Sequence, residues 1–124
     1  MTICVDAKLD YPAACNACET VLLHQVQRFS DGHLSNVRLS LLTFCSSTLQ
    51  TSLTNGMADA VLRALRSSGA TVLGGPRAIA EGLVSAEHGV NGFSIEYGNK
   101  TCCVEVVESL EAAIDHINRY ILFQ

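Results

Sequence analysis

Apolar residues recur at helical spacing in two stretches of the chain. The first stripe occupies positions i, i+3, i+4, i+7 and i+8: Met57, Ala60, Val61, Ala64 and Leu65. Gly69 follows it and supplies a C-terminal stop. The second stripe follows Ser109, a good N-cap residue, and comprises Leu110, Ala113, Ile114, Ile117 and Ile121. These patterns predict two amphipathic helices.

Four short apolar runs have the composition of strands instead. They are residues 3–5, 21–24, 71–73 and 101–107. Gly74-Gly75 ends the third run and favours a tight turn, because no Gly-x-Gly-x-x-Gly or Walker pattern is present. Pro76 then suits the first turn of a short helix. Strands that alternate with helices predict a layered α/β/α domain around a mainly parallel sheet.

Residues from Gln25 to about Gly56 interrupt this regular alternation. The segment is rich in turn-forming and small polar residues. Within it, partial alternation is compatible with an extra strand at Val37, Leu39, Leu41, Leu42 and Phe44.

Composition limits the classes of function. The 124 residues suit one domain, and 48% are apolar while 16% are charged, which is typical of an interface-rich module. A net charge of −4 without a basic cluster argues against nucleic-acid or anionic-membrane partners. There is neither an apolar run of ~20 residues nor a signal-peptide pattern at Met1. We therefore expect a cytoplasmic protein.

Six cysteines are distributed along the chain. The length, the lack of an export signal and the apolar surroundings of Cys102-Cys103 favour reduced thiols over a disulfide scaffold. Cys15-x-x-Cys18 has the spacing of a redox pair or of half a zinc site, which keeps a redox or metal protein as a weaker hypothesis. No second Cys-x-x-Cys exists and the four histidines are scattered, so no metal site is expected.

The run from Asp10 to Thr20 places the thiol of Cys15 at a position that favours a nucleophile. Pro12 discourages a helix before it, whereas Asn16 and Glu19 suit a first helical turn. A helix over residues 16–20 would put Cys15 at its N-terminus, where unpaired N–H groups and the helix dipole favour the thiolate. A thiolate attacks carbonyl carbon. On spacing alone, a buried structural cysteine is the favoured interpretation.

The same run resembles a known enzyme family. Residues 5–17, with Glu19-Thr20, closely resemble gamma-glutamyl phosphate reductase (glutamate-5-semialdehyde dehydrogenase), and look most like the reductase half of the pyrroline-carboxylate synthases of proline biosynthesis. This family lies in the aldehyde dehydrogenase superfamily. Further stretches are similar in the same order, and the resemblance covers about two-thirds of the chain: residues 69–78, 96–98, 103–108 and 113–117.

The resemblance implies roles for particular residues. It puts the catalytic cysteine at Cys15, and Asn16 and Glu19 at family positions where we expect them to hold the helix start. The implied reaction takes gamma-glutamyl phosphate and NADPH to glutamate 5-semialdehyde through a cysteine thioester. Arg77 is a candidate cation for the substrate carboxylate, and we interpret His116 as structural or interfacial.

The chain also departs from the family. Residues at about 25–56 have no clear counterpart and are interpreted as an insertion. The dinucleotide-binding domain that precedes the family motif is missing, so no NADPH site is evident. We expect residues 1–124 to form a single partial catalytic domain that is inactive alone. The alternative is a non-catalytic module that dimerises or binds a homologue or the missing domain.

Overall fold

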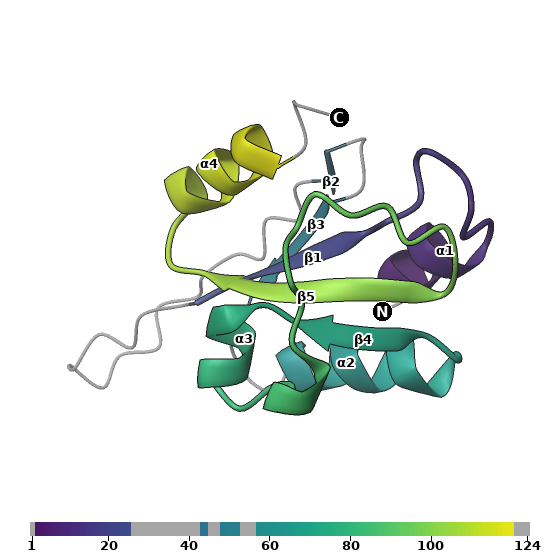
Figure 1. Cartoon of the computed structure of the whole chain (residues 1–124), viewed down its shortest axis with the longest axis horizontal. Coiled ribbons are helices and arrows are strands. Elements are labelled where there is room, and N and C mark those ends of the chain that lie inside the picture. Colours follow the sequence, from purple (N-terminus) through teal and green to yellow (C-terminus); the bar gives the residue numbers. More distant parts are fainter. Residues whose placement is uncertain (1, 26–42, 45–47, 53–56, 121–124) are drawn as a thin grey trace.

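The computed structural model describes residues 2–25, 43–44, 48–52 and 57–120 (Figure 1). The N-terminal half contributes α1 (Thr2–Leu9), β1 (Thr20–His24), β2 (Thr43–Phe44), β3 (Thr48–Ser52) and α2 (Met57–Ser67). The C-terminal half contributes β4 (Thr71–Gly74), α3 (Pro76–Ala80), the 3-10 turn η2 (Ala86–His88), β5 (Thr101–Val107) and α4 (Leu110–Tyr120).

The described strands form one sheet in the order β2-β3-β1-β5-β4. β3, β1, β5 and β4 run parallel, and only β2 is antiparallel to its neighbour β3. β1 lies in the middle, where Val21 pairs with Val104 and Leu22 with Glu105. The predicted α/β class with a mainly parallel sheet is therefore confirmed.

Alternate residues of the central strands fill two different cores. One face of β1 and β5 packs with α1 and α2 through Val21, Leu23, Val104 and Val106. On the other face, Leu22 and Val107 pack against Ala113 of α4. Figure 1 shows α4 on one side of the sheet and α2 on the other, which gives the expected layered arrangement.

Two sequence predictions were wrong. Residues 3–5 lie in the helix α1 and not in a strand, because Cys4 and Lys8, one turn apart, are both buried against the core. Residues 16–20 form no helix: turns continue to about Ala17, and β1 begins at Thr20. The tertiary contacts of the sheet outweigh the weak helical preference of so short a run.

Helix ends were predicted more successfully. Gly69 ends α2 with a left-handed φ of 88°, and Ala70 N–H donates to the Leu65 carbonyl. Ser109 caps α4, since its Oγ accepts from Ala112 N–H at 3.1 Å. The expected stripe of α4 is only partly buried, because Leu110 is 44% exposed.

The segment expected to be an insertion, at about 25–56, lies mostly outside the described residues. β2 and β3 are the parts that the structure describes, and the strand predicted from Val37 onward falls within them only at Phe44. β3 pairs with β1 in register, with Thr20 opposite Thr48.

Candidate active-site loop

Cys15 lies in a loop that joins the end of α1 to the start of β1. Two turns shape the loop: Ala14 N–H donates to the Tyr11 carbonyl at 3.0 Å, and Ala17 N–H donates to the Ala14 carbonyl at 2.9 Å. Since the loop enters a strand of a parallel sheet, it lies at the amino ends of the strands. In Figure 1 this loop, in purple, lies beside α1.

The Cys15 side chain is exposed. Neither its backbone N–H nor that of Asn16 donates a hydrogen bond to any residue that the structure describes. An accessible sulfur with two adjacent unengaged donors has the parts of a nucleophile and an oxyanion site. These donors belong to a turn and not to the predicted helix start.

Both ends of the loop are tied to the fold. Lys8, which has no exposed surface, donates from Nζ to Glu19 Oε2 at 2.8 Å. Cys18 N–H donates to the Ala7 carbonyl at 2.8 Å, and the Glu19 carbonyl accepts from Cys103 N–H at 2.8 Å. The ends of the loop are therefore anchored while its centre is accessible.

These contacts correct the expected roles of Asn16 and Glu19. Neither supports a helix N-terminus, because none forms there; Asn16 is exposed and Glu19 pairs with Lys8. The burial of Lys8 and its ion pair with Glu19 were not predicted from the sequence, since a lysine is usually expected to face solvent. Its position four residues after Cys4, on the same helical face, was the available signal.

The other described cysteines lie in different surroundings. Cys4, Cys18, Cys102 and Cys103 are all buried. Burial raises the pKa of Cys102 to about 11. Burial, and then the nearby Glu105 charge, raises the pKa of Cys103 to about 12. These buried thiols are therefore poor nucleophiles near neutral pH.

Tyr97 is a second residue whose setting the sequence analysis did not predict; it lies close enough to Cys103 and Glu19 to be affected by their charges. Burial, followed by the charges of Cys103 and Glu19, raises the pKa of Tyr97 to about 12. Its hydroxyl therefore stays protonated further into the alkaline range than that of an ordinary tyrosine. The signal was its place within the similar stretch 96–98.

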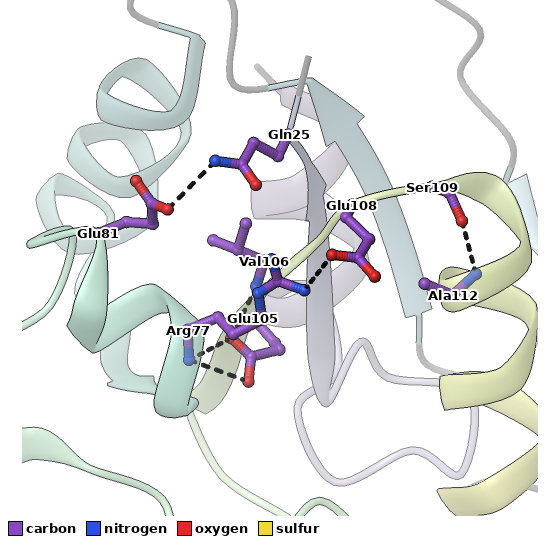
Figure 2. A network of polar contacts seen from close by, with 8 residues as sticks. All are labelled: Gln25, Arg77, Glu81, Glu105, Val106, Glu108, Ser109 and Ala112. Atoms are coloured by element: carbon purple, nitrogen blue, oxygen red, sulfur yellow. Dashed lines mark hydrogen bonds and ion pairs between the residues drawn. The ribbon is translucent and has the colours of Figure 1, made fainter. Parts of the chain in front are cut away.

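Arg77 and Cys15 lie at opposite ends of the parallel strands: Arg77 at the carboxyl ends and Cys15 at the amino ends. Arg77 belongs to α3, which follows the carboxyl end of β4, and its guanidinium already pairs with Glu108 at 3.1 Å (Figure 2). The structure therefore does not bring Arg77 to Cys15. The intervening strands are about 13–23 Å long at 3.3 Å per residue.

The start of α3 is filled by a carboxylate. Glu105, which is buried, accepts from Ala78 N–H at 2.9 Å. It also accepts from Arg77 N–H at 3.1 Å (Figure 2). A Cβ at Gly75 would overlap this carboxylate. The turn at Gly74-Gly75 thus lets Glu105 approach closely, which agrees with the predicted tight turn. The N–H groups that could bind the phosphates of a dinucleotide are already bonded to Glu105, whose negative charge would also repel a phosphate.

His116 sits in an aromatic cluster away from the loop. Its ring lies 4.5 Å from Phe93 and 4.7 Å from Tyr120, centroid to centroid. Burial, and then Arg119, lowers the pKa of His116 to about 4. A packed, neutral imidazole fits the structural interpretation.

The described residues contain neither a cluster of metal ligands nor a membrane-spanning helix. Among them, no group of three or more His, Cys, Asp or Glu side chains is placed to hold a metal ion. Likewise, none of the helices described is long and apolar enough to cross a membrane.

Comparison with known proteins gives the chain's relatives. It is 40% identical over 115 residues to delta-1-pyrroline-5-carboxylate synthase A of Arabidopsis thaliana. It is 32% identical over 119 residues to gamma-glutamyl phosphate reductase 1 of Synechocystis. The resemblance to gamma-glutamyl phosphate reductase is confirmed. The two matches cover 93% and 95% of the chain, which is more than the two-thirds seen from motifs.

The likeness concerns a part of each relative. The chain spans 12% of the Arabidopsis synthase and 21% of the Synechocystis reductase. No protein-family model matches it. The similarity to these reductase-type proteins of proline biosynthesis therefore extends over one segment that contains Cys15.

Proposed function

We propose that Cys15 is the nucleophile of a gamma-glutamyl phosphate reductase and captures the acyl group of an acyl phosphate. The observation that carries this proposal is the exposed thiol in a turn with two unengaged N–H groups. The names of the relatives supply the substrate class, gamma-glutamyl phosphate. Cys4, Cys15, Cys102 and Cys103 are free thiols, which supports a cytoplasmic setting.

Acyl capture proceeds in two stages. The Cys15 thiol loses its proton to solvent, and the thiolate adds to the acyl carbon of the substrate. The N–H groups of Cys15 and Asn16 donate to the oxyanion of the tetrahedral intermediate. The carbon–oxygen bond to phosphate then breaks, phosphate leaves with the electron pair, and a thioester on Cys15 remains.

Reduction of the thioester requires a hydride donor, and the resemblance implies NADPH. The described residues do not fit that cofactor, because Glu105 occupies the turn at Gly75. The part of the reaction proposed for this chain therefore excludes hydride transfer. Its proposed share of the reaction is the covalent half, and we expect no reductase turnover from the chain alone.

Acetyl phosphate tests acyl capture without a cofactor. We expect the chain to gain one acetyl group on the peptide containing Cys15, in a bond that neutral hydroxylamine cleaves as it does a thioester. Cys15→Ala should abolish the labile adduct, whereas Cys103→Ala should retain it. A hydroxylamine-stable adduct on lysines alone would contradict the proposal.

The second candidate function is an interaction module. It is favoured by two apolar side chains one helical turn apart on α4, Leu110 and Ile114, which are 44% and 46% exposed. This hypothesis predicts that the chain is a homodimer and that Leu110→Ser with Ile114→Ser makes it monomeric. Native mass spectrometry distinguishes these states, and a monomeric unaltered chain argues against it.

A further inference from the structure

We infer that the buried Lys8–Glu19 ion pair positions the Cys15 turn for acyl capture, an inference that rests on the function proposed above. Lys8 has no exposed surface, and its Nζ lies 2.8 Å from Glu19 Oε2. Lysine is almost never fully buried, since removing its charge from water is costly unless a partner compensates. Placing this charge inside the fold therefore calls for an explanation.

The pair joins the two ends of the loop that carries Cys15. Lys8 stands in the last turn of α1, and Glu19 immediately precedes β1. A second tie runs beside it, from Cys18 N–H to the Ala7 carbonyl. Among the residues that the structure describes, the backbone hydrogen bonds at the centre of the loop are those of its own two turns. We therefore infer that the position of Cys15 is set at these ends.

A salt bridge is not the most stabilising way to fill this space. Two apolar side chains of similar volume often stabilise a fold as well as a buried ion pair does. A charged hydrogen bond is, however, short and directional. It fixes the direction in which the loop leaves α1, and hence where the N–H groups of Cys15 and Asn16 point.

Acylation and alkylation of Cys15 respond differently to such positioning. Alkylation by iodoacetamide needs an accessible thiolate but develops no oxyanion. Acylation by acetyl phosphate also needs the two N–H donors in place. The ratio of the two rates at Cys15 therefore reports loop geometry separately from exposure or stability.

The test uses Lys8→Met with Glu19→Gln, which removes both charges and leaves no buried charge unpaired. We expect the folded variant to lower the acylation-to-alkylation ratio at Cys15 by at least about tenfold, because misplacement by about 1 Å can cost ~100-fold in rate. Lys8→Met with Glu19→Met serves instead if the first variant does not fold. The matched control is Lys100→Met with Glu87→Gln, two exposed positions, and should leave the ratio unchanged.

Three outcomes overturn the inference. A folded variant that keeps the original ratio shows that the ion pair supports the fold alone. An equal fall in the control removes the link to Lys8 and Glu19. Failure of the unaltered chain to acylate Cys15 refutes the proposed function itself, and the inference falls with it.

Discussion

The described cysteines fall into two classes according to the exposure of their side chains. Cys15 is exposed, whereas Cys4, Cys18, Cys102 and Cys103 are buried. The sequence indicated that Cys15 stands apart through its resemblance to a family motif. Its surroundings could not be predicted, because they depend on Lys8, a residue type that patterns assign to solvent.

Alkaline pH should destabilise the fold through the buried thiols. Folding raises the pKa of Cys103 from 9.0 to about 12, so its contribution is fully present below about pH 9 and is lost as the pH rises toward 12. We expect the free energy of unfolding to fall by up to about 1.4 kcal/mol per pH unit for each such thiol in that window. Urea denaturation at a series of pH values measures this slope.

Cys103→Ala should make that slope shallower above about pH 9. Gly92→Ala, which adds no titratable group and whose Cβ would enter open space, is the control and should leave the slope unchanged. An unaltered slope in Cys103→Ala would show that burial does not set the ionisation of this thiol.

Gly75 should not tolerate a side chain. A Cβ there would meet the Glu105 carboxylate and lie 2.7 Å from Phe93 Cζ. We expect Gly75→Ala to cost about 1–3 kcal/mol of unfolding free energy, as overpacking does. Gly92→Ala, whose Cβ would enter open space, should change stability little. Equal effects in the two variants would contradict the close approach of Glu105.

Helices and strands were predictable from the sequence where the apolar pattern extends over many residues. α2, β5 and α4 form where their patterns predict them, since eleven or seven residues average out local exceptions. The buried faces of the two helices match in part. α2 buries Ala58 and Leu62 beside the predicted Val61 and Leu65. Of its described residues, α4 buries Ala113 alone.

The sequence favours a strand at the start of α1 because residues 3–5 are apolar and partly β-branched. The residue type at position 8, lysine, gives no sign that it belongs to the core, although it is buried. The helix expected after Asn16 failed because β1 extends to Thr20, where backbone pairing with β3 and β5 takes precedence.

The cap of α4 gives a prediction at this scale. Ser109 Oγ accepts from Ala112 N–H, so Ser109→Ala should lower the free energy of unfolding by about 1 kcal/mol. Ser109→Asp retains an acceptor and should cost much less. Chemical denaturation compares the two, and identical stabilities would show that the cap contributes nothing.

In the proposed function, the molecule as a whole contributes the covalent half of a reductase site, carried on an α/β sheet. Its relatives are several-fold longer, and the turn at Gly75 that might have held a dinucleotide is filled by Glu105. The α/β class was predictable because strands and helices alternate. The separation of Cys15 and Arg77 to opposite ends of the strands was not, since it depends on which strand ends their loops join.

Turnover should therefore be absent from the chain alone. With pyrroline-carboxylate and NADP as substrates of the reverse reaction, we expect no NADPH formation above background, because donor and thioester would not be held together. Absorbance of NADPH measures this. Turnover that Cys15→Ala abolishes would contradict the incompleteness of the site.

Competitive alkylation tests most directly whether the loop sets Cys15 apart. The chain is treated briefly with iodoacetamide near neutral pH, and each cysteine peptide is quantified by mass spectrometry. A pKa near 11, as for Cys102, leaves about a hundredth of the thiolate of an ordinary thiol. We therefore expect the exposed Cys15 to react faster than Cys102 or Cys103, whose pKa values are raised by burial, and also faster than the buried Cys4 and Cys18. Equal labelling of these five thiols in the folded chain would contradict a reactive role for Cys15.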